Sequence, residues 1–167
     1  MAEPLEYFLT WCTYDTWLPG DPRGWIEQRH GWQLPRRGLE FEAAASMTED
    51  ACRLKRWQRD VVERAIEAVC QFRRWHLHAV NCRSNHVHLV VTANPHPIVV
   101  RNQLKSWSTR RLKESEAAGA HVTGPTAVRR KWWAEGGSQR YVNDEDSLEC
   151  AIRYVRDGQD GRSVETR

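Results

Sequence analysis

The chain has 167 residues, which is enough for one compact domain with a sizeable core, and its net charge is only +3. With 25 Lys and Arg against 22 Asp and Glu, the overall charge does not by itself indicate a polyanionic partner. No apolar run reaches the ~18 residues of a membrane span, the opening residues lack a basic region, and five scattered cysteines form no C-x-x-C pair. These features argue against a transmembrane protein, a zinc ribbon and a disulfide framework, and we expect a cytoplasmic protein.

The first part of the chain predicts one strand and a long loop within a single domain. Residues 5–14 are short, aromatic and β-prone, as in a strand. Residues 18–46 carry repeated Pro and Gly, which predicts a long loop insertion. A binding flap and a disordered insert remain open for this loop, and its candidate DNA contacts are Arg23, Arg36 and Arg37.

A helix is predicted next, ending near residue 73. Ser46 and Glu49 have the spacing of a capping box, which would start this helix. Apolar residues then recur at steps of three and four, as on one side of an amphipathic helix. The expected stripe consists of Leu54, Trp57, Val61, Ala65, Ala68 and Phe72.

Residues 76–81 and 86–92 predict two strands of a hairpin with a polar four-residue connection. Side chains alternate between the faces of a strand, so His86 and His88 share one face. The opposite face receives Val87, Leu89 and Val91. Two imidazoles on a stiff strand suit a divalent metal such as magnesium, manganese or zinc, although this spacing alone is a weak signal.

A second helix is predicted at about residues 97–115, with Pro97 as its first residue. Three apolar side chains, Val100, Leu104 and Trp107, are expected to point inward. Five cations precede the acid Glu114 and are expected to point largely outward, which favours a helix that contacts phosphates over a merely solvated face. They are Arg101, Lys105, Arg110, Arg111 and Lys113.

The last part of the chain predicts a strand and a helix. The segment 131–142 contains a Gly-Gly-Ser turn and a final strand, with a hairpin-like form as an option, and Lys131 lies beside two tryptophans that could stack bases. Asn143 or Asp144 can cap a final helix that stops at Gly158. Its apolar stripe is Leu148, Ala151, Ile152 and Val155. The order of elements predicts an α+β fold, a ferredoxin-like antiparallel sheet with helices on one face.

Five segments in chain order carry a family resemblance: FLTWCTYDTWLPGDPRGW, NHVHLVV, LKSWSTRRLK, WWAEGGSQRYV and IRYVRDG. The chain resembles the HUH-class single-tyrosine transposases, and among them the REP-associated, IS200-like type. The resemblance implies an enzyme that cleaves and rejoins single-stranded DNA next to hairpins through a 5′-phosphotyrosine intermediate. It also implies Mg or Mn as cofactor, His86 and His88 as metal ligands and Tyr154 as nucleophile. Single-stranded or hairpin DNA is the implied partner, a nucleoid-associated location is expected, and a homodimer stays open.

One position departs from the family pattern. The family usually has Gln or Asn as a third metal ligand four residues after the tyrosine, where this chain has Gly158. Gln159 would be rotated by ~140° from Tyr154 in a continuing helix, but a helix end at Gly158 could return it to the metal. We therefore expect Gln159 as the third ligand, with Asp157 as the alternative.

Three alternatives to this interpretation remain open. Tyr141 is the rival nucleophile, although its alternating neighbours predict a core position. A structural zinc site could draw on His76, His78, Cys82, His86 and His88, but pairing of Asn81 with His86 would put the first two on the opposite face. A hairpin-binding module without cleavage activity is the third alternative, and Gly158 favours it.

Overall fold

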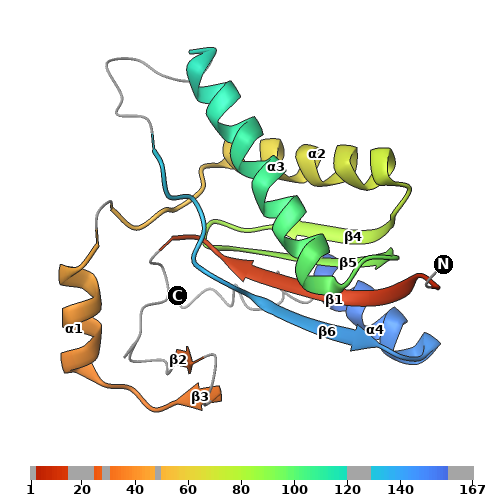
Figure 1. Cartoon of the computed structure of the whole chain (residues 1–167), viewed down its shortest axis with the longest axis horizontal. Helices are drawn as coiled ribbons and strands as arrows, with labels where there is room; N and C mark the ends of the chain where they lie inside the picture. The colour runs from red at the N-terminus through yellow and green to blue at the C-terminus, as the bar shows by residue number, and fades with distance from the viewer. Residues whose placement is uncertain (1–2, 15–24, 28–30, 48–49, 120–128, 158–167) are drawn as a thin grey trace, which may run out of the picture.

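The computed structural model describes residues 3–14, 25–27, 31–47, 50–119 and 129–157. Four of its strands form one antiparallel sheet in the order β4-β5-β1-β6 (Figure 1). Their bounds are Leu5–Cys12 for β1, His76–Cys82 for β4, His86–Ala93 for β5 and Ser138–Val142 for β6. The two central strands, β1 and β5, bring segments together that are some eighty residues apart in the chain, with Leu9 opposite Leu89.

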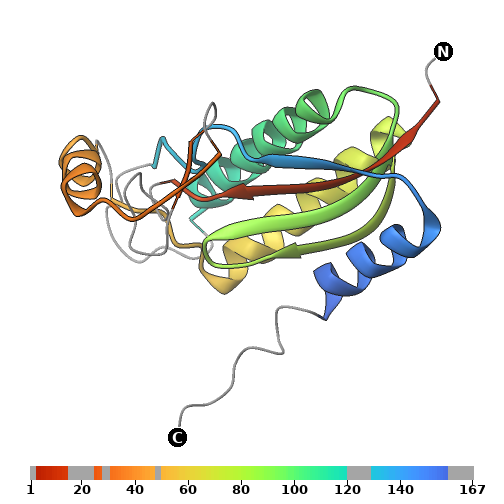
Figure 2. The same cartoon turned by 90° about the horizontal axis from the view of Figure 1, so that it is seen from below.

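Three helices pack on this sheet, and they cover both of its faces. α2 (Arg56–Arg73) and α3 (Pro97–Ala117) lie on one face, whereas α4 (Glu145–Arg156) lies on the other and contacts β4 and β5 (Figures 1 and 2). The expected α+β antiparallel fold is confirmed. The expectation of helices on one face is right for α2 and α3 and wrong for α4, because an amphipathic stripe does not specify which face of a sheet it covers.

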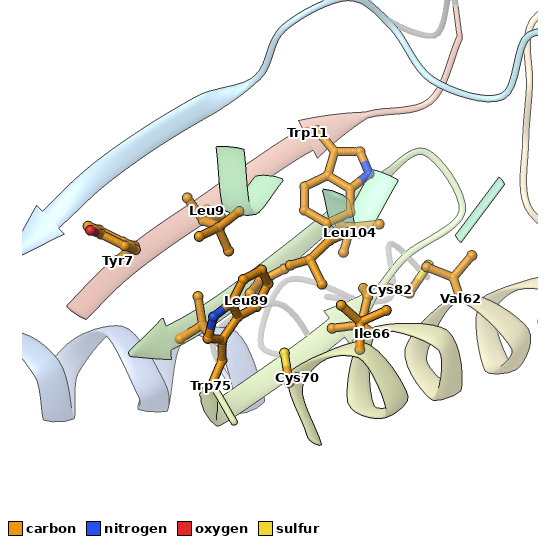
Figure 3. Packing of buried hydrophobic residues seen from close by; sticks show 14 of the residues in the cluster. Tyr7, Leu9, Trp11, Val62, Ile66, Cys70, Trp75, Cys82, Leu89 and Leu104 are labelled. Atoms are coloured by element: carbon orange, nitrogen blue, oxygen red, sulfur yellow. The ribbon is translucent and has the colours of Figure 1, made fainter. Parts of the chain in front are cut away.

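The main hydrophobic core lies between the sheet and the pair α2 and α3 (Figure 3). Alternation along the strands builds it, since Val87, Leu89 and Val91 of β5 are fully buried on this face, as predicted. The same face of β1 contributes Tyr7, Leu9 and Trp11. A second, smaller cluster lies under α4 and contains Ala79, Val90, Ala151 and Val155.

α2 differs from its prediction in both start and stripe. It begins at Arg56, where the Lys55 backbone N–H donates to Gln58 Oε1 at 2.8 Å. The buried stripe is Gln58, Val62, Ala65, Ile66, Val69 and Cys70, whereas Phe72 is 82% exposed. Ser46 does not start this helix, because it follows an earlier one, α1 (Arg37–Ala45), as its C-cap. The predicted stripe was therefore displaced by about one residue around the helix.

The segment expected as a long loop holds regular structure in its described part. β2 (Trp25–Glu27) and β3 (Gly31–Gln33) pair as a small antiparallel ribbon, and α1 follows. Figure 1 shows this group to one side of the four-stranded sheet. The insertion is thus a folded addition to the sheet domain where the structure describes it.

The chain approaches β6 along the end of β1. Thr13 forms an isolated antiparallel bridge with Trp133, so this segment pairs with the continuation of β1 and forms no hairpin with β6. Gly137 follows with φ of +142°, and a Cβ there would lie 2.5 Å from the Thr10 carbonyl oxygen. Only glycine fits this close approach of two backbones without displacement.

Candidate active site

His86 and His88 lie side by side on β5 and face the side of the sheet that α4 partly covers. Their positions opposite Cys12 and Thr10 of β1 are set by the antiparallel register. The two ring centroids are 4.3 Å apart. The sequence prediction that these two histidines share a face opposite the core is therefore confirmed.

Each imidazole is oriented by a hydrogen bond at Nδ1. His88 Nδ1 lies 2.9 Å from Thr10 Oγ1, and His86 Nδ1 lies 2.6 Å from Asn85 Oδ1. Histidines that bind metals commonly have the second ring nitrogen held in this way, which fixes the ring and its tautomer. The sequence alone predicted no role for Thr10 or Asn85. Two signals were present, since Asn85 directly precedes the histidine pair and Thr10 alternates with the core residues of β1.

His88 is held in its neutral form. Burial lowers the pKa of His88 to about 3, with smaller contributions from His86 and Arg83. Neutral imidazole is the form that coordinates a metal. The pair therefore fits a divalent cation as two of its ligands.

Tyr154 lies on α4 next to this pair. The N-cap of the helix is Asp144, one of the two predicted caps, whose side chain accepts a hydrogen bond from the Ser147 backbone N–H at 2.7 Å. Tyr154 is 50% exposed, and its ring centroid is 5.9 Å from that of His88 and 6.1 Å from that of Phe8. The structure thus places a half-exposed phenol against the histidine face.

Two side-chain hydrogen bonds fix α4 on the edge strand β4. Asn81 Nδ2 donates to the Val155 carbonyl at 3.0 Å, and Arg156 Nη2 donates to the His78 carbonyl at 3.0 Å. Val155 itself is fully buried under the helix. The two α4 residues in these bonds directly follow Tyr154, so the bonds hold this part of the helix on β4.

Tyr141, the rival nucleophile, lies on the other side of the sheet. It is paired with Tyr7 across β1 and β6, and the two rings meet edge to face at 5.4 Å. Tyr7 belongs to the main core, so Tyr141 faces away from His86 and His88. The expected core position is also wrong, because Tyr141 is 46% exposed.

The two candidates for a third metal ligand differ in what can be said of them. Asp157 is exposed and forms the C-cap of α4, with its backbone N–H donating to the Arg153 carbonyl oxygen at 2.8 Å. Gln159 and Gly158 lie outside the described residues. Across the described ranges, no cluster of three His, Cys, Asp or Glu side chains is placed to hold a metal.

The position of Cys82 argues against the structural zinc site. Asn81 pairs with His88 rather than with His86, and the register shifts between Leu77 and Ala79. As a result His76 and His78 share the face of the other two histidines, contrary to the prediction. Cys82 instead points into the main core, and His76, opposite Thr92, lies ~13 Å along the sheet from His88. The five residues therefore do not form one site.

The expected DNA-contacting cations lie in different surroundings. Arg101 is only 6% exposed and donates from Nη1 to Gln139 Oε1, which corrects its predicted outward position. Lys105 is also turned inward, since Nζ donates to the carbonyls of Ala134 at 2.8 Å and Gly136 at 2.9 Å. Burial, with Arg101 nearby, lowers the pKa of Lys105 to about 8. Lys105 thus holds the turn before β6, and Arg101 is bonded to β6 itself, so both are poorly placed to bind phosphates.

The other expected cations are exposed. Arg110 and Arg111 both form ion pairs at 3.1 Å with Glu114, on the sheet face away from Tyr154. Lys113, Lys131, Arg36 and Arg37 are exposed as well, and Arg23 lies outside the described residues. A role of these side chains in DNA binding stays a prediction.

Residues 47–157 match the family described as transposase, IS200-like. Because this match takes in more than half of the chain, the protein belongs to the IS200-like transposase family, as its sequence motifs predicted. No curated protein matches the chain. In the described part of the chain, no helix has the length and apolar character of a membrane span.

Two solved structures are similar to this chain. One is a REP-associated tyrosine transposase bound to a REP hairpin, with 12% identity, a TM-score of 0.50, and coverage of 92% of this chain and 65% of that one. The other is a candidate transposase from Deinococcus radiodurans R1, with 17% identity, a TM-score of 0.42, and coverage of 95% and 93%. This chain thus spans less than two thirds of the first structure's length. At such identities the likeness concerns the fold.

Proposed function

We propose that this protein cleaves and rejoins single-stranded DNA next to hairpins, with Tyr154 as the nucleophile. The observation that supports this most directly is the contact of Tyr154 with His88, at 5.9 Å between ring centroids, in a member of the IS200-like transposase family. A nucleophile needs a neighbouring group that can act on the same phosphate, and the two histidines face that position. The similar fold of a protein bound to a REP hairpin supports hairpin DNA as the substrate.

In this proposal the phenolic oxygen of Tyr154 attacks the scissile phosphorus in line with the leaving 3′ oxygen. A bond forms between Oη and phosphorus, the bond from phosphorus to the 3′ oxygen breaks, the phenol loses its proton and the 3′ oxygen gains one. The products are a 5′-phosphotyrosine and a free 3′-hydroxyl. One phosphoester replaces another, so the 3′-hydroxyl of a second strand can reverse the step and join two ends without ATP.

The phenol requires activation, because its ordinary pKa is about 10. His86 and His88 would hold Mg or Mn, which when bound would supply Lewis-acid polarisation of the scissile phosphate. Thr10 and Asn85 keep the two imidazoles oriented for this role. Tyr154, half exposed on its helix, is accessible to a DNA strand that lies against the histidine face.

A third oxygen ligand would complete the protein's share of a metal site. Hard cations favour oxygen ligands in octahedral geometry, and phosphate and water can supply only part of them. We propose Gln159 for this position, with Asp157 as the alternative. Gln159→Ala should raise the Mn²⁺ concentration needed for half-maximal cleavage by a large factor, and Asp157→Ala much less; the opposite ranking would assign the ligand to Asp157.

The decisive experiment is a denaturing gel of labelled hairpin oligonucleotides that carry single-stranded extensions. The protein is incubated with the DNA with and without Mg²⁺ or Mn²⁺, and a metal-dependent covalent protein–DNA adduct is expected. Hairpin binding without an adduct under any of these conditions would support the second candidate, a hairpin-binding module that does not cleave. That candidate is favoured by Gly158, which stands where the family usually has a third metal ligand.

A further inference from the structure

Half of the sheet face that carries the histidines lies beside α4 instead of beneath it. α4 packs on β4 and β5, and Figure 2 shows it displaced from β1 and β6. On this half, Phe8 is opposite Arg140 and Thr10 is opposite Ser138. These four residues define a surface, here called the β1–β6 shelf, which adjoins Tyr154 and His88.

Arg140 is connected to the candidate active site through one aromatic ring. Its guanidinium carbon lies 5.3 Å from the centroid of the Phe8 ring. The Phe8 ring in turn stacks on His88 at 5.9 Å and meets Tyr154 at 6.1 Å. Arg140 is thus two ring contacts away from both the proposed nucleophile and a proposed metal ligand.

Arg140 carries an exposed positive charge. Among the described residues, no acidic side chain forms an ion pair with it. A cation–π contact with the Phe8 ring does not use up the N–H donors of the guanidinium, and these can still bind an anion. A planar guanidinium can stack and make two parallel hydrogen bonds to a phosphate at once, which an ammonium group cannot.

We infer that Arg140 binds a backbone phosphate of the single-stranded DNA that adjoins the scissile phosphate. This inference rests on the proposed function, because it takes the same strand as its ligand. The β1–β6 shelf offers a cation and an aromatic ring, the combination that suits a single strand with a charged backbone. Contact at a fixed distance from Tyr154 sets the register of the strand, and so determines which phosphate lies in front of the phenol.

The test measures binding and chemistry separately. Fluorescence anisotropy in the Tyr154→Phe background gives the affinity for a hairpin with a single-stranded extension and for the bare hairpin, with and without Arg140→Ala. We expect Arg140→Ala to weaken binding of the extended DNA about tenfold and to leave the bare hairpin unchanged. Arg140→Lys should recover part of the loss. The control is Arg64→Ala, an exposed arginine on α2 at the opposite face, which should have no effect.

A neutral methylphosphonate placed at each position of the extension identifies the phosphate concerned. At one position, the methylphosphonate should weaken DNA binding by the Tyr154→Phe protein. The same methylphosphonate should have no further effect on the protein that also carries Arg140→Ala, as in a double-mutant cycle. The inference is wrong if the Arg140→Ala variant binds the extended DNA as tightly as the Arg64→Ala variant does. It is also wrong if every methylphosphonate that weakens binding does so equally when Arg140 is replaced by Ala. If the wild-type protein forms no adduct while the Arg140 effect is present, the proposed function fails and the binding site stands.

Discussion

The position of Tyr154 depends on a small apolar cluster, and Val155→Ala tests this dependence. Val155 is fully buried between α4 and the sheet and packs with Ala79, Val90 and Ala151. The substitution removes two methyl groups, worth ~1.6 kcal/mol by transfer, and the remaining cavity brings the expected loss to about 2 kcal/mol. Since this cluster has only four buried members, the loss is a large part of what holds α4 on β4 and β5.

The expected consequence is local. Tyr154 and His88 belong to different elements, so opening of α4 separates them without unfolding the main core. We expect faster hydrogen exchange of α4 amides, little change in β5 amides, and a lower initial rate of adduct formation. Val62→Ala is the matched control, because Val62 is equally buried but lies on α2 at the opposite face.

Comparing Val155→Ala with Val62→Ala shows whether the effect is local to α4. Val62→Ala should lower the free energy of global unfolding, measured by urea denaturation. The difference between the hydrogen-exchange rates of α4 and β5 amides should stay as in the unmodified protein. The reasoning is refuted if Val155→Ala slows adduct formation no more than Val62→Ala does, or if the exchange of α4 is the same in both. In that case other contacts, such as the Asn81 hydrogen bond, would hold the helix.

Three further predictions follow from the site and the turn before β6. Tyr154→Phe should abolish the covalent adduct on a denaturing gel while hairpin affinity stays nearly unchanged, since the ring contact with His88 survives; any remaining adduct would remove Tyr154 from the mechanism. Replacing His86 or His88 by Ala should abolish cleavage with little change in melting temperature, and unchanged Mn²⁺ affinity of the double variant in calorimetry would rule out the metal assignment. Gly137→Ala should cost about 2 kcal/mol or more in urea denaturation, because its Cβ would meet the Thr10 carbonyl; a loss near zero would contradict the close approach.

The features that the sequence predicted well depend on short-range periodicity. Two-residue alternation was enough to place His86 and His88 opposite the core. The stripe of α4 was also predicted correctly, with Ala151 and Val155 buried and Asp144 as the cap. In both segments polar and apolar positions are sharply separated, so only one register is compatible with burial.

The failures concern longer-range choices. Two neighbouring stripes of α2 contain apolar side chains, and either could face the sheet. In the structure the stripe with Val62 is buried against the sheet, and Phe72, from the other stripe, is exposed. The register shift between Leu77 and Ala79 moves His78 to the face of His88, and nothing in the local sequence marks it. Arg101 is buried, and its guanidinium donates to Gln139, a residue far along the chain.

The unequal sizes of the two apolar clusters have a consequence for how this protein can diverge. Most of the buried residues lie between the sheet and α2 and α3, whereas the histidines and Tyr154 lie on the opposite face. Substitutions on the face with the histidines and Tyr154 therefore leave the main source of folding energy intact. A lineage could lose cleavage, alter its metal ligands or change its target strand while every descendant still folded, so foldedness alone would not distinguish an active transposase from an inactive relative.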